Sequence, residues 1–120
     1  MKKVLVADDK APNRELIRTV LEQAGYFVLE AADGEEALNH AREHVPDLIV
    51  LDLHMPRLDG FGALAELRRD GRFTQTPIVA LTASAMQGDR DRALEAGFTA
   101  YLAKPISLVV LRREMERLLA

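Results

Sequence analysis

The sequence contains no cysteine and no tryptophan, and aromatic residues make up only 5% of its 120 residues. Without thiols, the chain cannot form a disulfide scaffold, a thiolate metal site or a cysteine nucleophile. An excess of one charge is also missing, because 16 basic and 19 acidic residues give a formal net charge of −3. This balance argues against nonspecific binding to nucleic acid or to an anionic membrane.

Long apolar runs are absent as well. The first run, residues 4–7, stops at Asp8 and Asp9 and is too short for the core of a signal peptide or for a membrane span. A length of 120 residues fits one domain, which buries roughly two-thirds of its unfolded surface, and 48% of the residues are hydrophobic and can supply its core. We therefore predict a single cytoplasmic domain over residues 1–120.

Short apolar runs recur along the chain and predict strands. The runs are residues 4–7, 27–29, 48–51, 78–81 and 100–102. Runs that are apolar on both faces are typical of a parallel sheet covered by helices on both sides. The second and fifth runs are the least apolar, which favours edge positions and the strand order 2-1-3-4-5.

Each run is followed by residues with helical spacing. The signals are Pro12 to Gly25, a capping-box pair at Asp33 and Glu36, the apolar positions Phe61, Leu64 and Leu67, residues 88–96, and Ser107 ahead of Leu108 and Leu111. Alternating strands and helices of this kind predict an α/β fold with right-handed crossovers. In such a fold, ligands bind beyond the carboxyl ends of the strands.

Polar residues stand at these strand ends. Asp8 and Asp9 follow the first run, Asp52 the third, Thr82 the fourth and Lys104 the fifth. Three converging carboxylates repel one another unless one is protonated or a cation lies between them, and hard oxygen ligands suit Mg²⁺. An ammonium and a hydroxyl beside them are equipped to contact a phosphoryl group, for which an aspartate is a known covalent acceptor.

These motifs together resemble the receiver domain of two-component response regulators, which has a flavodoxin-like fold. The matching segments are residues 6–9, 51–56 with Asp59 and Gly60, 81–83 and 101–105. The resemblance covers essentially the whole chain and implies a (βα)5 three-layer sandwich. Residues 81–89, 95–97 and 100–107 are similar to stand-alone cell-cycle regulators and to receivers of hybrid sensor kinases, and less so to receivers of DNA-binding transcription factors.

The resemblance also implies a role for each site residue. Asp52 would be the phosphoacceptor, and Asp9, Asp52 and the backbone carbonyl of His54 would bind Mg²⁺ directly, with Asp8 acting largely through water. Thr82 and Lys104 would contact the phosphoryl oxygens.

Further roles follow from the same resemblance. The Lys104–Pro105 bond would be cis, and Tyr101 would be the aromatic switch that turns inward when Thr82 moves. The side chains of His54 and Ser84 would stand where the family tunes the lifetime of its acyl phosphate.

The partners implied are a sensor histidine kinase or a histidine phosphotransfer protein as phosphodonor, and a downstream protein as target. We expect no direct contact with nucleic acid or membrane, and a monomer or a weak phosphorylation-dependent dimer. The domain would catalyse only its own phosphotransfer and autodephosphorylation. We expect no output domain after Ala120, so the response would pass through a protein contact.

Two other functions compete with this one. A phosphatase of the haloacid dehalogenase type would need a second aspartate two residues after the nucleophile, where this chain has His54. A receiver-like interaction module that is not phosphorylated would usually lose the acidic pair, Thr82 or Lys104. A flavin-binding flavodoxin is excluded because Asp8 and Asp9 would repel its phosphate.

Three weaker patterns are better explained by structure alone. His40 to His44 matches H-x-x-E-H, but Val45 and Pro46 end the helix at once. The G-x-G-x-x-A match at residues 60–65 begins well after its strand, so a loop and a helix start explain it. The arginines of the last helix alternate with glutamates, as on a solvated helix face.

Overall fold

The computed structural model describes residues 1–83 and 87–120, and in these ranges five strands alternate with five α-helices and one 3-10 turn. The strands are β1 (Lys3–Ala7), β2 (Phe27–Ala31), β3 (Leu48–Asp52), β4 (Ile78–Thr82) and β5 (Ala100–Ala103). The helices are α1 (Ala11–Gln23), α2 (Gly34–His44), α3 (Gly60–Arg69), α4 (Gln87–Ala96) and α5 (Leu108–Leu118), with the 3-10 turn η1 at Gly71–Phe73.

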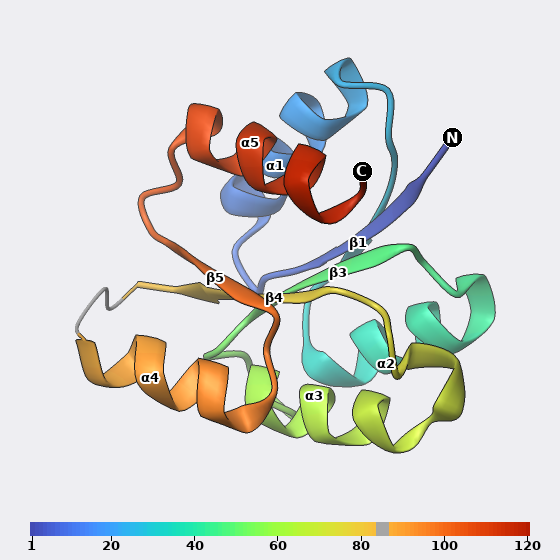
Figure 1. Ribbon diagram of the computed structural model, residues 1–120, viewed down its shortest axis with the longest axis vertical. Helices are drawn as coiled ribbons and strands as arrows, with labels where there is room; N and C mark the ends of the chain where they lie inside the picture. The colour runs from blue at the N-terminus through green and yellow to red at the C-terminus, as the bar shows by residue number, and fades with distance from the viewer. Residues whose placement is uncertain (84–86) are drawn as a thin grey trace.

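The strands form one parallel sheet in the order β2-β1-β3-β4-β5, as the sequence predicts. Every residue of β3 and β4 is buried, whereas β2 and β5 keep partly exposed positions, as expected of strands at the edges. Figure 1 shows α1 and α5 on one face of the sheet and α2, α3 and α4 on the other.

Two apolar cores lie on the two faces of the sheet. Alternate residues of one strand point to opposite faces, so Leu5 packs with α2 and α3 while Val4 packs with α1 and α5. Phe73 of η1 is fully buried in the first core. Continuous apolar strands were therefore the correct signal for a sheet covered on both sides.

The predicted helix caps are largely confirmed. Asp33 Oδ1 accepts from Glu36 N at 2.8 Å, and Ser107 Oγ accepts from Val110 N at 3.3 Å. The capping box differs in one bond, because Glu36 Oε1 accepts from Ala32 N and not from Asp33 N. These side chains satisfy backbone groups that a helix end leaves without intrahelical partners.

Some boundaries differ from the prediction. Asp52 and Thr82 are the last residues of β3 and β4 and do not follow those strands, because ladder pairing continues one residue further on each. Strand β2 runs on to Ala31 for the same reason. None of the described helices has both the length and the apolar character that a membrane crossing requires.

Candidate functional site

Three carboxylates meet at the carboxyl edge of the sheet. Oxygens of Asp8, Asp9 and Asp52 all lie within 4.8 Å of one another. The neighbouring strands β1 and β3 bring them together, since Ala7 pairs with Leu51 immediately before them. Asp8 is completely buried and Asp52 is 3% exposed, whereas Asp9 is open to solvent.

Lys104 joins two of these carboxylates. Its Nζ lies 2.8 Å from Asp52 Oδ2 and 2.9 Å from Asp8 Oδ2. Strand β4 lies between β3 and β5, and the Lys104 amide donates to the Thr82 carbonyl at 2.8 Å. The long lysine stem therefore crosses the end of β4 to reach the acidic cluster, whose formal charge is then 3− plus 1+, or 2−.

Burial and hydrogen bonding shift the pKa values of Asp52 and Lys104 in opposite directions. Burial raises the pKa of Asp52, and hydrogen bonds from Lys104 and from the His54 amide offset part of that rise. The His54 amide donates to Asp52 Oδ1 at 3.1 Å. For Lys104, burial lowers the pKa, but the hydrogen bonds to Asp52 and Asp8 outweigh it and the net pKa is raised. Lys104 is therefore a cation of the site at neutral pH.

Both carboxylate oxygens and the backbone carbonyl of Asp8 accept hydrogen bonds. Its Oδ1 accepts from Lys10 N at 2.9 Å, and its Oδ2 accepts from Asn13 Nδ2 at 3.3 Å as well as from Lys104. Its backbone carbonyl accepts from Arg14 Nη1 at 2.8 Å. A fully buried carboxylate requires such partners, because an unpaired one would be strongly disfavoured.

Thr82 ends β4 beside the Asp52 end of β3, and Tyr101 lies in the edge strand β5. Thr82 is buried at the end of β4, and its hydroxyl donates to Asp89 Oδ2 of α4 at 3.4 Å. Tyr101 of β5 is half-buried, with the Arg90 guanidinium 5.2 Å from its ring centroid. The side chain of His54 is exposed, and the Lys104–Pro105 bond is cis. Ser84 lies outside the described residues.

Sequence reasoning missed the contacts of Asn13, Arg14 and Asp89. Asn13 and Arg14 stand in the first turn of α1, a few residues after the acidic pair, and this proximity is the signal that could have suggested them. Asp89 lies 7 residues beyond Thr82. Nothing in the sequence pattern distinguishes it from the other acidic residues of α4.

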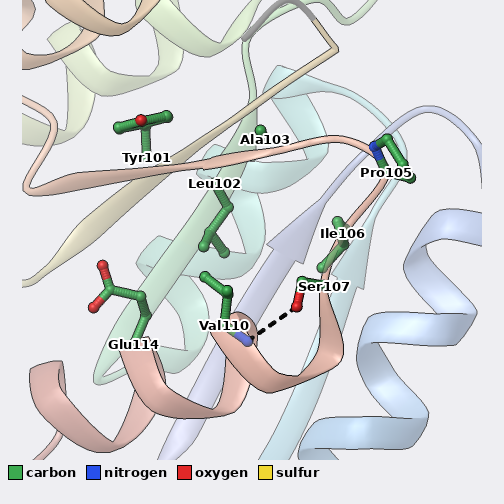
Figure 2. A pocket seen from close by; sticks show the side chains of 8 residues that line it. All are labelled: Tyr101, Leu102, Ala103, Pro105, Ile106, Ser107, Val110 and Glu114. Carbon is green, nitrogen blue, oxygen red and sulfur yellow. Dashed lines mark hydrogen bonds between the residues drawn. The ribbon is translucent and has the colours of Figure 1, made fainter.

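A hollow of about 380 Å³ lies between the edge strand β5 and α5. Figure 2 shows its lining, and the dashed line marks the Ser107 cap on Val110. It is lined by residues of β5, of the β5–α5 loop and of α5, namely Tyr101, Leu102, Ala103, Pro105, Ile106, Ser107, Val110 and Glu114. The three carboxylates are not part of this lining, although Ala103 and Pro105 flank Lys104 in sequence.

The donor set of the acidic cluster fits Mg²⁺. All the side-chain donors are hard carboxylate oxygens, and the residual formal charge after pairing with Lys104 is 2−. Mg²⁺ is bound in proteins through one or two carboxylates and keeps several water molecules, which suits a site with one solvent-exposed carboxylate, Asp9. Among the described residues, this is the one group of three or more such side chains close enough to share an ion.

The strand order, the helices on both faces and the acidic carboxyl edge define the class of CheY-like domains with a flavodoxin fold. The solved CheY4 of Vibrio cholerae matches with a TM-score of 0.93 and 34% identity over 98% of both chains. The receiver domain of the sensor histidine kinase PA1611 from Pseudomonas aeruginosa PAO1 matches with a TM-score of 0.89 and 39% identity, over 97% of this chain and 95% of that one. That structure holds a magnesium ion coordinated in its active site cleft.

Sequence comparison gives the family. Residues 4–116 match the response regulator receiver domain. The polar-differentiation response regulator DivK of Brucella anthropi is 39% identical over 107 residues, which are 89% of this chain and 87% of DivK. The probable transcriptional regulator ycf27 of Guillardia theta is 46% identical over 105 residues, which are 88% of this chain but only 40% of that protein.

The chain belongs to the response regulator receiver domains of two-component signalling. Such a domain is not a conventional enzyme. The relatives include the expected kinds, DivK and a receiver of a sensor histidine kinase, and also transcriptional regulators, which the sequence patterns had disfavoured.

Proposed function

We propose that this chain is a phosphorylation-dependent switch in which Asp52 accepts a phosphoryl group from a phosphohistidine. The observation that carries the proposal is the set of three carboxylates within 4.8 Å at the sheet edge, two of them joined by Lys104 at 2.8 and 2.9 Å. An oxygen of Asp52 forms a bond to phosphorus while the phosphorus–nitrogen bond of the donor breaks, and the imidazole nitrogen keeps the electron pair. The product is an acyl phosphate on Asp52.

The residues around Asp52 supply positioning and charge neutralisation, which provide most of the catalysis in phosphoryl transfer. The Lys104 ammonium, already beside Asp52, contacts an oxygen of the transferred group. Thr82, at the end of the neighbouring strand, turns its hydroxyl from Asp89 toward another oxygen. Lys104 and Thr82 would both contact negatively charged oxygens of the phosphoryl group.

Asp9, Asp52 and the His54 carbonyl would hold Mg²⁺ directly, and Asp8 would hold it largely through water. When bound, the ion neutralises the charge shared by the carboxylates and the incoming phosphoryl oxygens. The hard oxygen donors and the exposed position of Asp9 support this assignment.

The movement of Thr82 would carry the signal to α4, β5 and α5. When the Thr82 hydroxyl leaves Asp89, the start of α4 loses its hydrogen bond to β4. Tyr101 then turns into the space that Thr82 vacates, and this changes the surface around Arg90. The phosphoryl group thus biases an equilibrium between two conformations of the domain. The family and the description of DivK as a response regulator support an output through contact with a target protein.

We further propose that residues 1–120 form one cytoplasmic receiver domain, monomeric or weakly dimeric when phosphorylated. Its donor would be a sensor histidine kinase or a histidine phosphotransfer protein. The membership of the chain in a two-component family supports such a donor.

Radiolabelled phosphotransfer tests the proposal. The wild-type chain is incubated with Mg²⁺ and a phosphorylated histidine kinase, or with acetyl phosphate as a small donor. Asp52→Asn is expected to abolish labelling. Asp59→Asn is the matched control, because Asp59 lies seven residues away as the cap of α3, and asparagine also accepts from the Gly62 amide. Equal labelling of the two variants would refute the assignment of Asp52.

A further inference from the structure

The peptide group between Asp8 and Asp9 is held by an arginine. Strand β1 ends at Ala7, and the Asp8 amide still donates to the Ala31 carbonyl of β2 at 3.1 Å. The Asp8 carbonyl accepts from Arg14 Nη1 at 2.8 Å. The guanidinium of Arg14, on α1, thus donates to the carbonyl of the peptide that joins Asp8 and Asp9.

Arg14 is itself anchored from the other side. Its Nε lies 3.2 Å from Glu30 Oε1 on β2, and the two side chains are only 19% and 23% exposed. The planar fork of the guanidinium presents both donors at once, which a lysine ammonium on a flexible stem does not reproduce. Arg14 therefore links the β1–α1 turn to the neighbouring strand through two fixed hydrogen bonds.

This link bears on the direction of the Asp9 carboxylate. A peptide group is planar, so holding its carbonyl fixes the orientation of the next Cα, which is that of Asp9. Asp8 is independently fixed by the Lys10 amide, by Asn13 and by Lys104. The exposed carboxylate of Asp9, in contrast, depends on the geometry of the peptide that precedes it.

We infer that Arg14 is a positioning residue for the metal site: by holding the Asp8–Asp9 peptide, it orients the carboxylate of Asp9 toward those of Asp8 and Asp52. The inference rests on the proposed function, because it requires Mg²⁺ to bind at the acidic cluster. Arg14 acts through Asp8 and Glu30 and is not assigned a contact with the ion or the phosphoryl group.

Arg18 provides a matched control on the same helix. It shares Glu30 with Arg14, at 2.8 Å, and also pairs with Glu22, but it makes no hydrogen bond or ion pair with Asp8 among the described contacts. Arg18→Ala therefore removes the same charge, and an ion pair with the same glutamate, from α1 without releasing the Asp8 carbonyl. A difference between the two variants isolates the bond to the peptide.

The test measures Mg²⁺ binding by titrating MgCl₂ at constant ionic strength and following backbone amide shifts in NMR spectra. Arg14→Ala is expected to weaken Mg²⁺ binding about tenfold, as is typical when a residue that orients a metal ligand is lost. Arg18→Ala should change it by less than about twofold, because exposed ion pairs contribute little. Arg14→Lys should fall between the two, and it keeps the test available should Arg14→Ala not fold.

A second readout separates positioning from general damage. The rate of labelling by acetyl phosphate is measured against Mg²⁺ concentration. For Arg14→Ala, the half-saturating Mg²⁺ should rise about tenfold while the maximal rate stays within about twofold of wild type. A merely structural defect would lower the maximal rate and leave the Mg²⁺ dependence unchanged.

The outcomes distinguish the inference from the function on which it rests. If the wild-type chain binds Mg²⁺ and is labelled, but Arg14→Ala and Arg14→Lys bind the ion as tightly as Arg18→Ala, the role of Arg14 is refuted and the switch stands. If the wild-type chain neither binds Mg²⁺ nor takes a phosphoryl group, the proposed function and the inference both fail.

Discussion

Gly60, the first residue of α3, lies directly against the backbone of the phosphoacceptor strand. A Cβ at this position would collide with the Asp52 carbonyl oxygen and would lie 2.9 Å from Leu53 Cα. The Gly60 amide also donates to the Leu53 carbonyl at 3.2 Å. We predict that Gly60→Ala forces the start of α3 away from the end of β3.

The expected magnitude follows from the kind of atom that must move. Overpacking generally costs 1–3 kcal/mol, and about 3 kcal/mol applies here because backbone atoms cannot rotate away. Alanine recovers about 1 kcal/mol over glycine in a helix. The net loss of about 2 kcal/mol should lower the Tm by about 8 °C in a domain of this size.

Thermal unfolding followed by circular dichroism measures this change, with Gly62→Ala as the control in the same helix. A Cβ at Gly62 would meet Leu58 Cδ1 at 2.5 Å, which is the far end of a flexible side chain and can shift. Gly62→Ala should therefore leave the Tm close to that of wild type or raise it. If Gly60→Ala unfolds at the same temperature as Gly62→Ala, the tight packing of α3 on Asp52 is refuted.

Two further predictions concern the ions of the domain. Mg²⁺ at ten times its Kd should stabilise the wild-type chain by about 1.4 kcal/mol, because it binds only the folded state, and EDTA should reverse the rise in Tm. Asp9→Asn should lose most of this stabilisation, and an unchanged rise in Tm would contradict the metal assignment. Hydrogen bonds from the Arg72 side chain and amide lower the pKa of Asp70 from 3.8 to about 2. Because the folded-state pKa is lowered, the stabilisation is present above pH 3.8 and is lost as the pH falls toward 2. Arg72→Ala should raise this pKa toward 3.8, as followed by carboxyl ¹³C shifts, and a value still near 2 would refute the cause.

Much of the fold could be predicted because its signals are local in the chain. The continuous apolar runs at β3 and β4 indicated central strands, and the poorer runs at β2 and β5 indicated edges. The caps at Asp33 and Ser107 were recognisable because each bonds an amide three residues away. The predicted ends of β2 and β3 fell one or two residues short, since pairing with a neighbouring strand decides where a strand stops.

The content of the site was predictable for a related reason. Once the strand order is known, residues at the carboxyl ends of adjacent strands must be neighbours, which places Asp8, Asp9 and Asp52 together. Their chemistry then follows from residue type. The resemblance to receiver domains added individual roles, which the phosphotransfer and Mg²⁺ experiments test.

Hydrophobic period and residue type are properties of short segments, so they were enough to predict a parallel α/β domain with an acidic edge. Three contacts become visible in the folded chain alone: Lys104 reaches past β4 to join Asp8 and Asp52, Thr82 bonds Asp89, and Arg14 holds the Asp8–Asp9 peptide. Such contacts depend on how far one side chain reaches and on backbone atoms. Because every residue has the same backbone atoms, no sequence pattern identifies the ones that are contacted. The same reason hid the role of Gly60, whose missing side chain matters only because Asp52 lies against it.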